Sequence, residues 1–230
     1  MFNGKMKAVT FSYDDCTTQD IRLVELLNKY GLKCTFNVNS LCLGGKNELV
    51  REGVTVRHDK LTAEQVKEVY AGHEVAVHTL THPYLQTIED EQVIIDQIEK
   101  DRENLEAIVG YDVRCMAYPG NGNDSDRVAE IIKNKTKIKV ARTTVSTFNF
   151  DLQDNLYQFN PTIHHLHFNK IFDLAEEFIN MQPDSPKIFY IWGHSFEFDI
   201  HDTWDEFEKF LQLISGKDDI FYGTNSEVLL

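Results

Sequence analysis

The feature that most limits the possible folds of this chain is an alternation of short apolar runs with longer amphipathic segments. Residues 7–12 favour a strand, and residues 17–30 favour a helix that ends before Gly31. The same periodicities predict strands at 34–38, 74–78, 115–118, 138–142, 187–192 and 220–222, and helices at 62–70, 90–109, 126–134, 172–181 and 203–214. Repeated units of this length indicate parallel strands with helices outside, as in a barrel or a doubly wound sheet.

Length and charge narrow the class of protein. Residues 1–230 are expected to form one domain, since no repeat, linker or low-complexity tract interrupts the pattern. The excess of 37 Asp and Glu over 23 Lys and Arg gives a formal net charge of −14, which argues against nucleic acid as a partner. We expect no membrane segment, because no apolar run approaches the roughly 20 residues that a spanning helix needs. Without a recognisable leader we expect a cytoplasmic protein, unless a leader has been trimmed.

Polar side chains follow several predicted strands at the point where each strand ends. Asp14 and Asp15 follow the first strand, His78 and His82 the third, and His194 a late one. Both candidate architectures build their active sites at the carboxyl ends of parallel strands. An isolated Asp-Asp pair is found in structural turns at least as often as in functional sites. The convergence of these groups at several strand ends favours a functional site.

Two histidines four residues apart and a carboxylate suit a metal. His78 and His82 can present both imidazoles on one side, and an aspartate completes a His-His-Asp set with open positions for water and substrate. Histidines that cap turns or fill the core are the competing interpretation. The set is typical of a hydrolytic site that holds a Zn²⁺-like ion.

These residues resemble the polysaccharide deacetylases of carbohydrate esterase family four. Ser12-Tyr13-Asp14-Asp15-Cys16 is similar to the family's Thr-Phe-Asp-Asp-Gly motif, and residues 78–82 match its His-Ser/Thr-x-x-His motif without a gap. The resemblance implies an α/β fold, a distorted (β/α) barrel with about seven parallel strands and outer helices. It implies Asp14 as general base, and Asp15, His78 and His82 as ligands of a divalent metal ion, Zn²⁺ first, with Co²⁺, Ni²⁺ or Mn²⁺ as alternatives.

The resemblance also implies an activity and further site residues. The expected enzyme removes N- or O-linked acetyl groups from a sugar or oligosaccharide, with His194 as general acid, and in the N-linked case acts on non-peptide carbon–nitrogen bonds. In Ala117-Tyr118-Pro119-Gly120 the backbone N–H of Gly120 matches the family's oxyanion donor, and Tyr118 and Pro119 are expected to bind substrate. Trp192 stands where the family has leucine, so we expect it to line the acetate pocket.

Two departures from the family pattern bear on activity. Cys16 replaces a glycine, which brings a β-carbon into the turn that aims both aspartates. The motif around Tyr118 lacks the arginine that normally pairs with the base, so we expect Arg142 to replace it, with Arg114 as second choice. A relative that binds carbohydrate without turnover, and a hydrolase of carbon–nitrogen bonds in small cytosolic amides, therefore remain as alternatives.

Two other groups have more than one interpretation. His164-His165-Leu166-His167 suggests either a second metal site or a strand with alternating polarity. Glu197 and Asp199, just after His194, suggest either contacts with sugar hydroxyls or solvated loop carboxylates.

Overall fold

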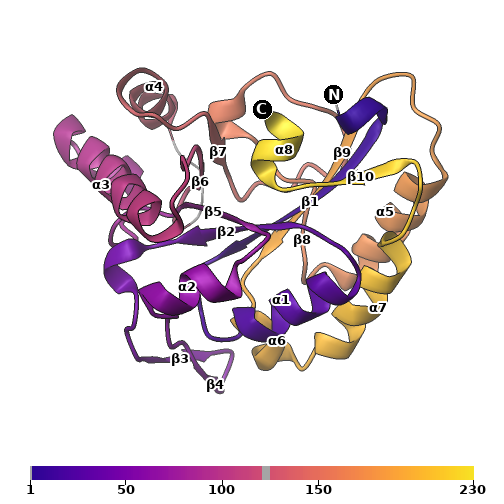
Figure 1. The fold of residues 1–230 in the computed structure, drawn as a ribbon, viewed down its shortest axis with the longest axis horizontal. Helices are drawn as coiled ribbons and strands as arrows, with labels where there is room; N and C mark the ends of the chain where they lie inside the picture. The colour runs from indigo at the N-terminus through magenta and orange to yellow at the C-terminus, as the bar shows by residue number, and fades with distance from the viewer. Residues whose placement is uncertain (1, 121–124) are drawn as a thin grey trace.

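The computed structural model describes residues 2–120 and 125–230 and contains the open parallel barrel that the sequence predicts (Figure 1). Seven strands follow one another in the order β7-β6-β5-β2-β1-β9-β8, and a further strand, β10, pairs with β1. Within residues 2–120 and 125–230, the paired strands of this sheet run parallel to one another. The expected distorted (β/α) barrel with outer helices is therefore confirmed.

The elements of the barrel have the following bounds. The strands of the large sheet are β1 (Lys7–Asp14), β2 (Cys34–Val38), β5 (Glu74–Val77), β6 (Cys115–Ala117), β7 (Val140–Arg142), β8 (Ile163–His164), β9 (Lys187–Gly193) and β10 (Ile220–Tyr222). The helices are α1 (Asp20–Lys29), α2 (Ala63–Val69), α3 (Glu91–Val109), α4 (Asp126–Lys135), α5 (Phe168–Asn180), α6 (Phe196–His201), α7 (Trp204–Ile214) and α8 (Asn225–Leu229). Neighbouring helices pack in the order α4, α3, α2, α1, α7, α5 around the outside of the sheet.

Local sequence sets the limits of several helices. Helix α2 begins with a capping box, in which the Thr62 and Gln65 side chains satisfy each other's backbone N–H groups. Helix α3 begins at the N-cap Asp90, whose carboxylate accepts from Gln92 N. It ends at Gly110, which adopts the left-handed conformation that glycine accepts without steric cost.

Side chains alternate across the strands and so divide the sheet into two faces. On β1 the outward face is large and apolar, whereas the inward face is small and polar and ends at an aspartate. The outward residues are Val9, Phe11 and Tyr13, which join the main core under the helices; the inward residues are Ala8, Thr10, Ser12 and Asp14. The interior of the barrel therefore delivers polar groups to its rim, while the helix-facing side supplies most of the apolar core.

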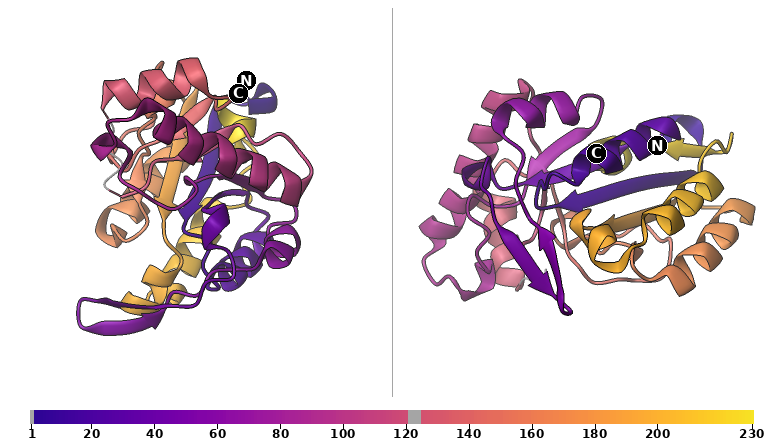
Figure 2. Two further views of the ribbon diagram at one scale, coloured as in Figure 1. Left: turned by 90° about the vertical axis from the view of Figure 1, so that its left-hand side faces the viewer. Right: turned by 90° about the horizontal axis from the view of Figure 1, so that it is seen from below.

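Several elements lie where the sequence predicted loops. Strands β3 (Glu48–Arg51) and β4 (Val54–Arg57) form an antiparallel hairpin that reaches away from the barrel (Figure 2). Helix α6 follows β9 directly, and its Phe196 and Ile200 pack against Val56 of the hairpin. The two-residue strand β8 was also missed. No helix within residues 2–120 and 125–230 has both the length and the apolar character needed to cross a bilayer.

Lys7, at the start of β1, is a buried cation that joins the sheet to the end of α5. Its side chain is 2% exposed, and its ammonium donates to the carbonyls of Phe178, Ile179 and Met181 at 2.8–3.2 Å. These carbonyls belong to the last turn of α5, where a helix leaves its acceptors unpaired. The ammonium also pairs with Asp219 at 2.8 Å.

We expect Lys7→Met to lower the free energy of unfolding by about 2–3 kcal/mol, since hydrogen bonds to a charged group are lost and buried carbonyls are left unpaired. Urea unfolding followed by circular dichroism measures this change. The matched variant Lys209→Met removes an exposed lysine of α7 and should leave the midpoint almost unchanged. Equal midpoints for Lys7→Met and the parent protein would show that Lys7 does not stabilise α5.

Candidate active site

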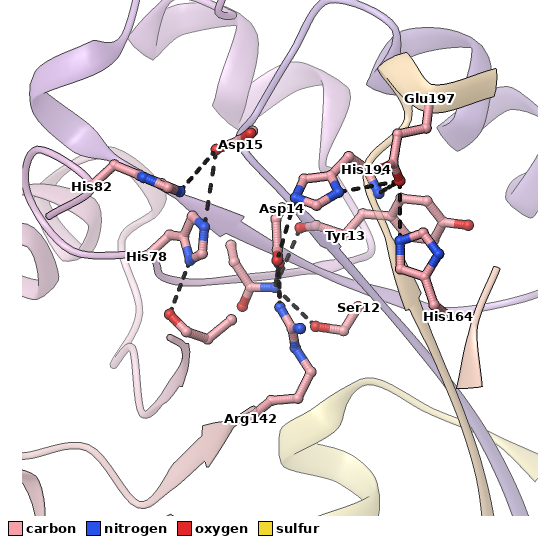
Figure 3. A network of polar contacts seen from close by, with 12 residues as sticks. Ser12, Tyr13, Asp14, Asp15, His78, His82, Arg142, His164, His194 and Glu197 are labelled. Atoms are coloured by element: carbon pink, nitrogen blue, oxygen red, sulfur yellow. Dashed lines mark hydrogen bonds and ion pairs between the residues drawn. The ribbon is translucent and has the colours of Figure 1, made fainter. Parts of the chain in front are cut away.

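The turn after β1 sends two adjacent carboxylates in different directions (Figure 3). Asp14 is the last residue of β1 and faces the barrel interior, while Asp15 and Cys16 have left-handed φ values of 80° and 54°. Glycine adopts this backbone conformation with the least strain. Cys16 adopts it too, although it carries a β-carbon. Its thiol is buried, and burial is the main reason why its pKa is raised to about 12.

Asp14 lies among hydrogen-bond donors inside the barrel. Nη2 of Arg142 contacts both of its carboxylate oxygens, at 2.5 and 2.6 Å, and Asn37 donates to Oδ1 at 2.8 Å. His194 Nε2 lies 4.0 Å from Oδ2. Burial acts to raise the pKa of Asp14, but Arg142, through its charge and its hydrogen bond, and the nearby histidines together outweigh burial, and the pKa is lowered. The arginine missing from the motif near Tyr118 thus has a counterpart that comes from β7.

Asp15, His78 and His82 form a group whose ligand atoms lie within 4.8 Å of one another. Oδ1 of Asp15 is 3.9 Å from His78 Nε2 and 3.7 Å from His82 Nε2. Donors about 2.0–2.1 Å from a tetrahedral Zn²⁺ would be roughly 3.3 Å apart, so small side-chain movements suffice to place an ion between them. Two imidazoles and one carboxylate are also the donor types that Zn²⁺ prefers.

The surroundings of His78 prepare it to act as a metal ligand. Its Nδ1 is 2.9 Å from the carbonyl of Ala117, which requires the proton on Nδ1 and leaves the lone pair of Nε2 facing Asp15. Burial lowers the pKa of His78 to about 4, so the ring is neutral. The buried Asp101 accepts from the backbone N–H of His78 at 3.2 Å and holds the end of β5 in place. The donor set therefore fits a divalent cation.

His58 and Lys60, which follow the hairpin, also contact Asp15, and Lys60 Nζ lies 3.6 Å from the same Oδ1 that faces the two histidines. His58 Nε2 is 3.4 Å from Asp15 Oδ2, and Lys60 donates to the backbone carbonyl of Asp15 at 2.7 Å. Burial acts to raise the pKa of Asp15, but His58 and Lys60, together with His194 and His78, outweigh burial and hold the pKa well below its usual range. Sequence analysis did not find either residue, because neither belongs to a strand end or a motif.

Glu197 on α6 is a buried carboxylate around which three histidines gather. Its Oε2 lies 3.1 Å from His164 Nε2, 3.0 Å from His165 Nε2 and 3.2 Å from His194 Nδ1. Burial acts to lower the pKa of His194, but Glu197 and then the two aspartates raise it to about 9. Glu197 is 2% exposed, so its interpretation as a solvated loop carboxylate is wrong. Asp199 accepts from Trp204 Nε1 at 2.7 Å.

The hydrogen bonds of this cluster favour proton donors over a second metal site. The backbone N–H of Leu166 donates to His164 Nδ1 at 3.3 Å, so the proton of the neutral ring lies on Nε2 and faces Glu197. A metal bound to His164 Nε2 would require the ring proton to be on Nδ1. There it would face the backbone N–H of Leu166, so two donors would meet without an acceptor. His165 is wholly buried, with Nδ1 2.9 Å from the hydroxyl of Tyr13.

A cavity of about 500 Å³ opens beside this cluster. Gly120, Trp192, His194 and Arg51 are among its lining residues. Gly120 has φ +70°, and a β-carbon there would lie 2.1 Å from the Tyr84 ring, so no larger residue fits. Trp192 is 8% exposed, and the Arg142 guanidinium stacks on its ring at 4.6 Å.

Tyr118 and Pro119, which we expect to bind substrate, lie just before Gly120. Both are buried, and the hydroxyl of Tyr118 donates to the carbonyl of Tyr157 at 2.6 Å. The side chain of Tyr118 joins that of Met116 in the main core, because residues two apart on a strand share a face. Gly120, the next residue, lines the cavity, and a substrate contact by Tyr118 and Pro119 stays a prediction.

The fold is a (β/α) barrel, and carboxylates and histidines gather at the ends of its strands. This arrangement is typical of a hydrolase. The polysaccharide deacetylase family model matches residues 3–139, more than half of the chain. This chain belongs to the polysaccharide deacetylase family. A comparison with curated proteins finds no match.

Solved structures show the same fold at low sequence identity. A Streptococcus pyogenes deacetylase in complex with acetate is 23% identical with a TM-score of 0.53, and the match spans 65% of this chain and 61% of that one. A family 4 carbohydrate esterase from Streptomyces lividans, in complex with acetate, is 14% identical with a TM-score of 0.59 over 98% and 95%. A CE4 family pseudoenzyme from Bacillus anthracis is 20% identical with a TM-score of 0.53 over 100% and 67%.

Proposed function

We propose that this chain is a metal-dependent hydrolase that removes acetyl groups, N- or O-linked, from a carbohydrate. The observation that supports the proposal is that two adjacent carboxylates have different sets of partners. Asp14 contacts Arg142 and faces His194, whereas Asp15 faces His78 and His82. The proposed base, acid and ligand set thus meet at one rim of the barrel, the end at which (β/α) barrels carry their active sites.

Asp15, His78 and His82 would hold the divalent cation, with Zn²⁺ as the ion that best suits their donor types. A bound cation would polarise the acetyl carbonyl and make the attacking water more acidic. Asp14, ionised at neutral pH, accepts the proton of that water. The backbone N–H of Gly120 donates to the developing oxyanion at the cavity wall. His194, protonated because of Glu197, then gives its proton to the leaving nitrogen or oxygen.

The contact between Arg142 and Asp14 favours catalysis over binding without turnover. A carboxylate that acts beside a dication must keep its orientation, and the buried guanidinium supplies that constraint. Acetate and ammonia release over a panel of acetylated sugars and small amides tests the proposal. Acetate alone, from sugars, supports it; ammonia from the amides would favour the small-amide hydrolase, and neither product would favour a carbohydrate-binding protein.

We expect the purified protein to contain about one divalent cation per chain and His78→Ala to contain little, because the variant keeps only two of three ligands. Elemental analysis measures the content directly. His201→Ala, which removes a histidine of α6 outside the ligand group, is the matched control and should retain the ion. Equal metal content in His78→Ala and the parent protein would contradict this ligand set.

A further inference from the structure

We infer that the cavity beside His194 recognises an anionic substituent of the substrate, and that Arg51 at the tip of the β3–β4 hairpin binds it. The inference rests on the proposed function and extends it to a substrate class, an acetylated sugar that carries a negatively charged group. Arg51 is outside every family motif found in the sequence.

The hairpin places a guanidinium at the mouth of the cavity. Arg51 pairs with Val54 across a two-residue turn, Glu52-Gly53, whose φ values of 55° and 80° fit a tight hairpin. Packing of Val56 against Phe196 and Ile200 fixes the hairpin to α6. The hairpin projects from the barrel, but this packing and the contact of Arg51 with Glu197 hold the Arg51 side chain at the wall of the cavity.

The contacts of Arg51 leave most of its donors free for a ligand. Nη1 donates to Glu197 Oε1 at 2.9 Å, and within residues 2–120 and 125–230 this is the only polar contact of the side chain. The side chain is 49% exposed and lines the same cavity as Gly120 and His194. A guanidinium has five N–H donors in a planar fork that matches a carboxylate or a phosphate.

The charge of the cavity favours an anion. Glu197 is the only carboxylate among the described lining residues, and it is already paired with both Arg51 and His194. His194 is flanked by Glu197 and by Asp14, whose Oδ2 lies 4.0 Å from Nε2, so Arg51 is the cationic side chain of this cavity that keeps donors for a ligand. A neutral sugar does not require that arrangement.

Three related sugars test this inference. N-acetylmuramic acid carries a carboxylate that N-acetylglucosamine lacks, and N-acetylglucosamine 6-phosphate carries its charge on another position. Acetate release and calorimetric binding to Asp14→Asn are both measured for each sugar. We expect an anionic sugar to be preferred. Arg51→Gln should raise KM for the anionic sugar by about 10-fold and should change KM for the neutral sugar much less. The preference should weaken at high salt.

Arg57→Gln on the neighbouring strand is the matched control, because Arg57 lines a different surface hollow, and it should keep the preference. A preference for only one anionic sugar identifies whether a carboxylate or a phosphate is recognised. Equal use of neutral and anionic sugars, or an equal loss of kcat on all of them in Arg51→Gln, would overturn the inference and leave Arg51 as a partner of Glu197. Selective, Arg51-dependent binding without acetate release would support the inference while the proposed function fails.

Discussion

Arg142→Ala should lose turnover by about 10²-fold or more while it keeps its metal, because a positioned base contributes about 10²–10⁴-fold and Asp14 depends on this guanidinium for its orientation. The two side chains are 0% and 2% exposed, so the variant also leaves a buried carboxylate without its counter-ion. We expect the free energy of unfolding to fall by about 3–5 kcal/mol. Steady-state kinetics, elemental analysis and urea unfolding measure the three quantities.

A double variant separates the loss of charge balance from the loss of catalysis. Asp14→Asn with Arg142→Met removes both charges, so much of the stability should return, while activity should stay low because the base is absent. Arg114→Ala is the matched control, since Arg114 lies on the exposed approach to β6 and should change neither quantity much. Full turnover in Arg142→Ala would show that Asp14 needs no guanidinium.

The rim of the barrel was the part of the site most accessible from sequence. Alternation on β1 sets Asp14 on the interior face, and the same parity places His78 after Ala76 and Arg142 after Val140. A guanidinium two residues beyond a buried valine on β7 must then point into the same space as Asp14. This is why an arginine distant from the family's motif was a sound prediction for its position, although its role still awaits the variant above.

Residues outside that alternation were harder to find. Glu197 stands between Phe196 and Phe198 in a segment that reads as a loop, yet α6 buries it three residues after His194, the spacing at which helical side chains meet. The hairpin gave a weak signal, because Glu52-Gly53 is not one of the strong turn pairs and Val50 is 68% exposed. The signal available was the β-branched run Val54-Thr55-Val56, which follows Leu49-Val50 after a short polar and glycine segment.

The same arrangement explains why His194 is suited to donate a proton. Its ring stands between Glu197 on Nδ1 and Asp14 near Nε2, so negative charge on both sides favours the imidazolium. With a pKa of about 9 the ring is protonated at neutral pH. The donating form is lost as pH rises through that value, so a rate that depends on it should fall on the alkaline side. Glu197→Gln removes the larger stabilising charge and should move that fall to lower pH.

His194→Ala should therefore lose activity on N-acetyl sugars by roughly 10²-fold or more, the scale of a positioned general acid. An amine leaves poorly unless it is protonated as the carbon–nitrogen bond breaks. An aryl acetate has a leaving group that needs no proton, so its hydrolysis should fall much less. Parallel assays of both substrates, with metal content as a check on the ligand group, measure the difference.

The competing role for His194 is to orient Asp14 or the substrate, and it predicts a different pattern. A positioning histidine would matter for both substrates, because each needs the base and the oxyanion donor. His201→Ala is again a suitable control, being a histidine of α6 that does not line the cavity. Equal losses on amide and ester in His194→Ala would assign the proton to another donor. A selective loss on the amide would place the acid at His194, where Glu197 keeps it charged.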